Sequence, residues 1–329
     1  MNHRAFLVAA GAPLLATVAP RGLLAMPTGG GVVALVTADL EAHLVAVEVG
    51  SGRIVKRIAT APGPRSIESN VFGHVVVAHT AHGRLTVVDT ATLSVLGEID
   101  GLGEPRYTAM HPHERVAYVS DSRRREVVVI DLVRRAIVHR TRVPGPARHI
   151  SLSADGKALW TALGTKARAI AVLDVSDPRQ PRLQRTLTPP FLAHDVVFAP
   201  DDDRVWVTSG ARRAIAVYAR DASAPIRILQ ADAPPQHVAF SHSRAYVASG
   251  DDGTVRVHRL DGSLVRATSI PVGSYNVTYG LFDVTFGQPL AVTPSLDLGT
   301  VCILSPAGAV RTIRKIARSA HDACVVEAG

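Results

Sequence analysis

The chain has 329 residues, of which 47% are hydrophobic and only 5% aromatic, and its formal net charge is +8. It can bury a large core as one domain, because no long polar or low-complexity tract divides it in two. The two cysteines, Cys302 and Cys324, exclude a disulfide-rich scaffold, and without a Cys-x-x-Cys-His motif there is no covalent haem attachment. The basic balance favours anionic partners.

The first 25 residues have the pattern of a secretory signal: a basic start, an apolar stretch over residues 5–18 and a small-residue ending at Ala25. We predict a signal peptide over residues 1–25, a linker over residues 26–31, and a periplasmic or secreted protein. The start resembles a twin-arginine motif in which His3 stands in place of the first arginine, so that route and the Sec route both stay open. Prolines and an arginine interrupt the apolar stretch, so no transmembrane span is expected. Cleavage removes two arginines and leaves a charge of +6, from 8 − 2.

A strand pattern recurs along the chain with a period of about 40 residues, which is typical of β-propellers. Clear copies are Val-Ala-Tyr-Val-Ser around Tyr118 and Arg-Val-Trp-Val-Thr around Trp206. Successive copies are 41, 42, 42, 46, 40 and 45 residues apart, so seven copies predict seven blades. The central residues of the copies are Leu35, Val76, Tyr118, Trp160, Trp206, Tyr246 and Ala291.

A further strand follows each copy, most clearly over residues 85–89, 127–131 and 170–174. These strands are apolar almost throughout, which fits sheets covered on both faces by neighbouring blades. One carboxylate per blade just after a strand is typical of turn capping, so we interpret the aspartates that end these strands as turn residues. They are Asp89, Asp131 and Asp174.

Before every copy except the first lies another short strand that opens with a small residue, proline or tyrosine, followed by a polar residue. The first copy, at Val32, has no such strand before it, and the last such strand, over residues 320–326, has no copy after it. The simplest closure makes residues 320–326 the innermost strand of blade 1, so that residues 32–329 form one ring of four-stranded blades without open edges. The polar opening residues are Arg65, Arg106, Arg148, His194, Gln236, Asn276 and His321.

The phrases Tyr118-Val-Ser-Asp and Trp206-Val-Thr-Ser, with Val-Ile-Asp or Val-Leu-Asp patterns after such phrases, resemble the YVTN-repeat family of bacterial propellers. The resemblance covers residues 32–329 and implies an all-β, seven-bladed propeller. Relatives with similar repeats include surface-layer and periplasmic binding propellers, a DNA-binding periplasmic member, lactonases and the haem-bearing propeller of nitrite reductase. The resemblance therefore implies the fold and leaves the activity open.

The seven opening residues are expected to surround the mouth of the central channel, one from each blade. In a four-stranded blade, the connection into the innermost strand and the connection between the second and third strands emerge on the same face. Three consecutive blades contribute Arg65, Arg106 and Arg148, and each guanidinium offers a forked set of donors to a carboxylate, phosphate or sulfate. We predict an anionic small molecule or an acidic protein surface as the partner. The alternative is a wet funnel mouth that needs no ligand.

The outer loops of the same face are expected to be electrostatically two-sided. Basic residues belong to blades 3 to 5, and acidic residues belong to blades 6, 7 and 1, which favours oriented docking of an acidic partner; the alternative is that these charges serve solubility. The basic rim consists of Arg123, Arg124, Arg125, Lys166, Arg168, Arg212 and Arg213, and the acidic side of Asp39, Glu41, Asp251, Asp252 and Asp297.

Histidines are numerous, fourteen in all, and six map to or near the same face. A zinc or copper site needs three or four convergent ligands, and spacing across blades does not show convergence. The metal candidates are His194, His237 and His321, and either a metal ion or non-covalent haem stays open as cofactor. In the pairs His194-Asp195 and His321-Asp322, adjacent strand residues point opposite ways, which argues against a catalytic dyad. The other three histidines that map to or near this face are His79, His82 and His149.

Two classes of function stand after these observations. The first is an exported, non-catalytic propeller, expected to be a monomer, that holds an anionic ligand or acidic partner at its mouth. The second is a lactonase-like hydrolase or a metal- or haem-holding propeller that uses the histidines of the same face; no serine nucleophile elbow, metalloprotease helix motif or phosphate loop occurs. Nucleic-acid binding is a further alternative with little support, because aromatic residues are few and only Tyr107 and Tyr275 are expected in exposed positions.

Overall fold

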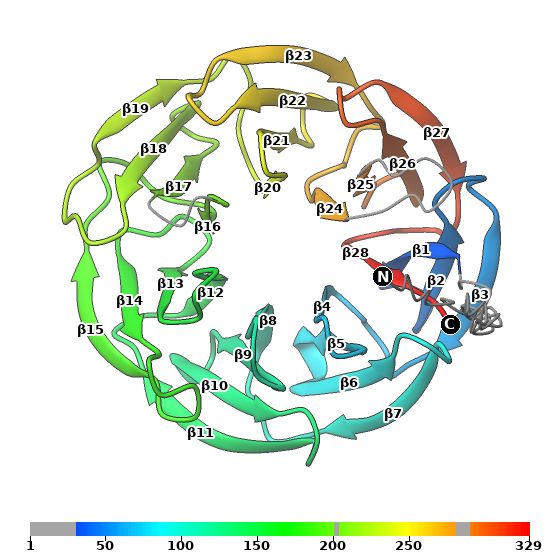
Figure 1. The fold of residues 1–329 in the computed structure, drawn as a ribbon, viewed down its shortest axis with the longest axis horizontal. Coiled ribbons are helices and arrows are strands. Elements are labelled where there is room, and N and C mark those ends of the chain that lie inside the picture. Colours follow the sequence, from blue (N-terminus) through cyan, green and yellow to red (C-terminus); the bar gives the residue numbers. More distant parts are fainter. Residues whose placement is uncertain (1–30, 201–203, 281–289) are drawn as a thin grey trace, which may run out of the picture.

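The computed structural model describes residues 31–200, 204–280 and 290–329. Seven four-stranded antiparallel sheets follow one another around a ring, as blades 1 to 7 in chain order (Figure 1). The predicted all-β, seven-bladed propeller is thereby confirmed. The predicted signal peptide lies outside the described residues, as does the predicted linker apart from Gly31. In the described part of the chain, no helix has the length and apolarity needed to cross a membrane.

Each blade has one strand beside the channel and another at the outer rim, and its strands are named below from the channel outward (Figure 1). Blade 1 contains β28 (Ala323–Glu327), β1 (Val32–Ala38), β2 (His43–Glu48) and β3 (Ile54–Ala59). Blade 2 contains β4 (Ser66–Ser69), β5 (His74–His79), β6 (Arg84–Asp89) and β7 (Ser94–Ile99), with a 3-10 turn at Thr80–His82. Blade 3 contains β8 (Pro105–Met110), β9 (Val116–Asp121), β10 (Glu126–Asp131) and β11 (Ala136–Arg142). Blade 4 contains β12 (Ala147–Leu152), β13 (Ala158–Leu163), β14 (Ile170–Asp174) and β15 (Arg182–Leu187).

The remaining three blades have shorter inner strands of three residues each. Blade 5 contains β16 (Val196–Phe198), β17 (Arg204–Ser209), β18 (Ala214–Ala219) and β19 (Arg227–Gln230). Blade 6 contains β20 (Val238–Phe240), β21 (Arg244–Ser249), β22 (Thr254–Arg259) and β23 (Leu264–Ser269). Blade 7 contains β24 (Thr278–Gly280), β25 (Leu290–Pro294), β26 (Thr300–Leu304) and β27 (Val310–Lys315).

The two ends of the described chain meet in blade 1, where β28 pairs antiparallel with β1 (Figure 1). Leu35 is opposite Cys324, and Val36 is opposite Ala323. This pairing confirms the predicted closure by the carboxyl-terminal strand. It covers the edge of β1, which would otherwise present a row of unpaired backbone groups to solvent. Both cysteines are free and buried.

The repeated strand pattern forms the interfaces between blades. Its central aromatic residues are almost completely buried, and three of the four, Trp160, Trp206 and Tyr246, pack against aromatic residues of the next blade. Trp160 of blade 4 meets Tyr218 of blade 5 edge-on, with ring centroids 5.7 Å apart, and Trp206 of blade 5 meets Phe240 of blade 6 at 5.2 Å. Because both faces of each sheet are covered in this way, most of the middle strands are largely apolar and do not alternate.

The aspartates that end the third strands are turn residues, as predicted. The carboxylate of Asp89 accepts hydrogen bonds from the backbone N–H and hydroxyl of Thr92, and Asp131 accepts from the N–H groups of Val133 and Arg134. Asp174 accepts from the N–H of Ser176 in the same way. These hydrogen bonds hold the pKa of Asp89 below its usual value, as expected for a capping carboxylate.

We expect removal of residues 323–329 to abolish the monomeric, cooperatively folded state, because deletion of β28 exposes the edge of β1 and opens the ring. A chain that lacks only residues 328 and 329 keeps all of β28 and serves as the matched control. Thermal unfolding followed by circular dichroism, together with size-exclusion chromatography, measures both. A longer truncation that melts like the control and elutes as a monomer would show that closure is dispensable.

Candidate functional site

The strand registers place the channel mouth and the outer loops on one side of the ring, called the upper face below. In blade 3, Pro105 at the start of the inner strand is opposite Asp121, which is in turn opposite Glu126 at the start of the third strand. The loop over residues 122–125 therefore emerges beside the opening of β8, as predicted. All seven opening residues lie at or just before the start of an inner strand; Asn276 is buried, and the other six are half-buried.

A β-bulge in two of the inner strands brings a second residue per blade into the channel. The register of β12 shifts between Ala147 and Ile150, and that of β8 shifts between Pro105 and Thr108. The extra residue in each strand changes the direction of the side chains within the bulge. Besides Arg148 and Arg106, the channel consequently receives His149 and Tyr107.

The three arginines predicted at the mouth do lie together. Arg65, Arg106 and Arg148, called the arginine cluster, line one small opening with His321 and Tyr107. Arg106 forms an ion pair with Glu104 at 2.5 Å, whereas within the described residues the guanidinium groups of Arg65 and Arg148 pair with no carboxylate. Burial lowers the pKa of Arg106, and the charges of Arg148 and Arg65 lower it further.

Three histidines from blades 4, 5 and 6 converge next to this opening. His149, His194 and His237, called the histidine cluster, offer nitrogen atoms that all lie within 4.8 Å of one another. Their ring centroids are 4.5 to 5.2 Å apart. Two members, His194 and His237, were among the predicted metal candidates. The third candidate, His321, lies outside the histidine cluster and beside the arginine cluster, where its Nδ1 is 2.9 Å from the carbonyl oxygen of Arg65.

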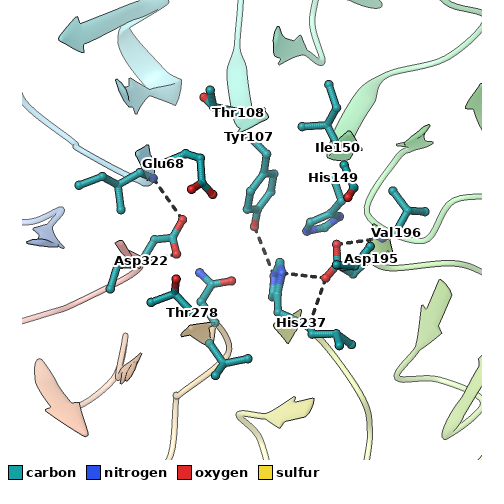
Figure 2. Close-up of a pocket in the computed structure, with 17 residues that line it drawn as sticks. Glu68, Tyr107, Thr108, His149, Ile150, Asp195, Val196, His237, Thr278 and Asp322 are labelled. Atoms are coloured by element: carbon teal, nitrogen blue, oxygen red, sulfur yellow. Dashed lines mark hydrogen bonds and ion pairs between the residues drawn. The ribbon is translucent and has the colours of Figure 1, made fainter. Parts of the chain in front are cut away.

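Two members of the histidine cluster have fixed partners on the Nδ1 side of the ring. Nδ1 of His237 lies 3.3 Å from Oδ2 of Asp195, which also accepts a hydrogen bond from the N–H of Val238, while Oδ1 accepts one from the N–H of Val196 (Figure 2). Nδ1 of His194 lies 3.3 Å from the carbonyl oxygen of Thr165. A ring that donates its Nδ1–H to an oxygen keeps a lone pair on Nε2. Asp195 thus orients a histidine of the next blade, and not His194, its neighbour in sequence.

His149 is the buried member of the cluster, with 1% of its surface exposed. Within the described residues, neither of its ring nitrogens makes a hydrogen bond of normal geometry. Burial, reinforced by the neighbouring histidines and Arg148, holds the pKa of His149 well below its usual value, and burial lowers the pKa of His194 to about 4. Both rings are therefore neutral near pH 7, and their lone pairs are free of protons.

A cavity of about 190 Å³ extends from the histidine cluster to two carboxyl groups on the opposite wall of the channel (Figure 2). Asp322 is half-buried and accepts hydrogen bonds from the N–H groups of Ile67 and Ala323, and Glu68 lines the same cavity but is exposed to the channel. Desolvation by the surrounding blades raises the pKa of Asp322 to about 8. The carboxyl of Asp322 therefore keeps its proton at pH values at which an exposed carboxyl has lost it.

The predicted charges of the outer loops are on the surface of the upper face. All members of the basic rim are exposed on blades 3 to 5, as are Asp251, Asp252 and Asp297 on blades 6 and 7, while Asp39 and Glu41 on blade 1 are half-buried. Tyr107 departs from its prediction as an exposed aromatic residue. It is half-buried in the channel, its ring centroid 4.3 Å from that of His149, because the bulge of β8 directs it inward.

Sequence reasoning assigned one polar residue per blade to the mouth and therefore missed the cluster as a unit. The missed functional residues are His149, Tyr107, Asp195, Glu68 and Asp322, as members of one cavity. The available signal was a second polar or aromatic residue directly after the opening residue, as in Arg106-Tyr107 and Arg148-His149. That signal does not show which side chains a bulge turns toward the channel.

Between pH 5 and pH 8, we expect the free energy of unfolding to fall less in the Asp322→Asn variant than in the wild type. The pKa of Asp322 is higher in the folded chain than in the unfolded chain, so the folded state binds more protons in this interval and deprotonation destabilises it. Urea denaturation at pH 5, 6.5 and 8 measures the slope. Asp252→Asn, at an exposed position of the same face, is the control and should follow the wild type. An Asp322→Asn slope parallel to wild type contradicts the prediction.

Comparisons with known proteins support the architecture. No family model matches the chain, and no curated protein matches it, so the likeness to the YVTN-repeat family stays a resemblance in sequence. A structure titled hydrazine synthase, from Kuenenia stuttgartiensis, has a TM-score of 0.70 and 16% identity, and the match covers 83% of this chain and 92% of that chain. A functionally unknown protein from Desulfotomaculum acetoxidans has a TM-score of 0.79 and 11% identity, with 90% and 99% covered. At such identities, these likenesses show the fold alone: the chain is a seven-bladed β-propeller.

Proposed function

We propose that the protein is an exported, non-catalytic propeller that holds an anionic ligand, or an acidic partner, at its upper mouth. The observation that carries this proposal is the arginine cluster. Three guanidinium groups from consecutive blades face one opening, and within the described residues only Arg106 has a carboxylate partner. A carboxylate, phosphate or sulfate group is the chemistry that such an arrangement recognises.

The unliganded arginine cluster is electrostatically unfavourable. Guanidinium groups are always charged, and here three of them repel one another in a partly desolvated opening. Among residues 31–200, 204–280 and 290–329, the buried Nε atoms of Arg106 and Arg148 find no hydrogen-bond partner. A bound anion offsets the repulsion between the guanidinium groups and accepts hydrogen bonds from their unpaired donors. Much of its affinity therefore comes from removing interactions that are unfavourable in the protein without an anion.

The size of the opening limits what enters it. The space between the three arginines is about 10 Å³, which is about the room that one water molecule needs. Only the oxygen atoms of a charged group therefore fit between the guanidiniums, and the body of the ligand lies above them. The basic rim on blades 3 to 5 is available there to a larger acidic ligand or partner surface.

Nucleic acid fits this mouth less well than a small anion or an acidic protein. Base stacking needs aromatic side chains in exposed positions. Tyr107 packs inside the channel against His149, and the hydroxyl of Tyr275 donates a hydrogen bond to Asp251 on the acidic side of the face.

We expect metal-free wild-type protein to bind inorganic phosphate or sulfate, with an affinity that falls as salt is added. The double variant Arg65→Gln/Arg148→Gln should bind at least tenfold more weakly, because each charge-assisted hydrogen bond contributes about 1.5–3 kcal/mol. The variant Arg123→Gln/Arg124→Gln removes two charges from the exposed rim and is the matched control for net charge. Isothermal titration calorimetry measures all three proteins. Equal affinity of the two double variants, or no binding by the wild type, would refute the arginine site.

A further inference from the structure

We propose that His149, His194 and His237 form a binding site for one divalent transition-metal ion of the zinc or copper class, with an open coordination position that faces the channel cavity. The site goes beyond the anion-binding function proposed above and rests on different residues. Among the described residues, no second group of three or more histidine, cysteine or acidic side chains converges as this group does. A set of three imidazole nitrogens binds zinc, copper or nickel in preference to magnesium or calcium.

Partners behind the ligand nitrogens already hold two of the rings in the required tautomer. The contacts from His237 to Asp195 and from His194 to the carbonyl of Thr165 involve Nδ1, which leaves a lone pair on both Nε2 atoms. The Nε2 of His237 now accepts a long hydrogen bond from the hydroxyl of Tyr107, at 3.5 Å, which a bound metal ion replaces. Metal-binding histidines in proteins typically donate their second N–H to a carboxylate or a backbone carbonyl. The cluster contains one example of each arrangement.

The third ring, His149, supplies an independent indication of a missing ligand. The residue is 1% exposed, and although the backbone of His194 lies near its ring nitrogens, neither nitrogen makes a hydrogen bond of normal geometry within the described residues. A buried polar group without a partner destabilises the folded state, and native structures contain few of them. Coordination of a metal ion by one of these nitrogens satisfies that atom and gives the burial of His149 a physical reason.

The spacing of the nitrogens requires a small closure on binding. The ligand atoms lie within 4.8 Å of one another, whereas two nitrogens bound to one tetrahedral zinc ion at the usual bond length are about 3.3 Å apart. The rings are inclined to one another by 44° to 77° and are not stacked face to face. Rotation of the side chains about their χ angles can therefore draw the nitrogens together without displacing a blade.

Three protein ligands leave a coordination position for water or a small ligand, as in zinc sites that exchange ligands. The cavity of about 190 Å³ beside His149 and His237 provides room for it and favours a bare ion over a porphyrin. Burial raises the pKa of Tyr107 far above neutrality, so its hydroxyl, 3.5 Å from Nε2 of His237, remains a hydrogen-bond donor next to this position.

The charged groups around the histidine cluster have opposite effects on a bound cation. Arg148 lies close enough to disfavour a cation at His149. The carboxyl group of Asp195, which contacts His237, favours one. A divalent ion also favours the ionised form of Asp322, so the opposite wall of the cavity gains negative charge when the site is filled.

Metal binding by untagged, chelator-treated protein tests the proposal, with Zn²⁺, Cu²⁺ and Co²⁺ titrated separately by calorimetry and Co²⁺ followed also by its visible absorption. The wild type should bind one ion per chain. His237→Ala and His149→Ala should each bind more than about 100-fold more weakly, a larger loss than removal of a group that only orients a metal ligand causes. His82→Ala removes an exposed histidine of the same face and should bind as the wild type does.

Asp195 is a positioning residue in this site, since it touches His237 and not the ion. Asp195→Asn should weaken binding by about 10- to 100-fold while the stoichiometry remains one ion per chain. Circular dichroism and thermal unfolding establish that each variant is folded, and the partly exposed His194→Ala replaces His149→Ala if the buried substitution prevents folding.

The proposal is overturned if the wild type binds none of the three ions more tightly than a Kd of about 100 μM, or if the cluster variants bind them as tightly as His82→Ala does. Failure of the anion site is separate from this result, because phosphate and sulfate affinities are measured on the metal-free protein. Loss of anion binding in the arginine variant with unchanged metal binding would show that the two sites are distinct.

Discussion

The geometry of the upper face depends on hydrogen bonds that fasten the inner strands of blades 2, 4 and 6 to the blade before each of them. The hydroxyl of Thr37 in blade 1 donates to the carbonyl of Arg65 in blade 2, and Ser120 in blade 3 donates to that of Arg148 in blade 4. Thr208 in blade 5 donates to that of Gln236 in blade 6. An innermost strand pairs with only one neighbour in its own sheet, so these hydroxyls fix its opening from the other side. The acceptors belong to site residues, and the ring thereby holds their side chains in place.

This arrangement places two clusters that favour ions of opposite charge side by side. The arginine cluster, from blades 2 to 4, favours an anion, and the histidine cluster, from blades 4 to 6, favours a cation with neutral ligands. Arg148 and His149 are adjacent in β12, so each site senses the charge held by the other. An anion at the arginines reduces the repulsion that a metal ion meets at the histidines, and the metal ion in turn attracts the anion. By linkage, any such coupling is equal in both directions.

The fold could be predicted from the sequence because its determinants repeat. The anchors from Leu35 to Ala291 recur at a nearly constant period, and the unpaired segments at the two ends of the repeat array specify the closure by β28. The convergence of three arginines followed from the same register. The histidine cluster did not, because it depends on a bulge in β12 that turns His149 into the channel and on a contact between Asp195 and His237, 42 residues apart. Side-chain alternation within a strand governs neighbours in sequence and is silent about neighbours across blades.

The repeated residues of the sequence determine the packing of the ring, and the residues that do not repeat line the channel mouth. The fold therefore gives little information about the activity. Residues of the repeated pattern, such as Trp160 and Trp206, pack between blades, and any ring of this kind needs large apolar side chains there. The positions at the inner-strand openings lie outside the repeated apolar pattern, so their side chains differ from blade to blade. Proteins that share the ring at 11% or 16% identity share its packing constraints. Chemistry at the mouth is then decided by about two residues per blade, and in this chain those residues place guanidinium groups beside imidazoles.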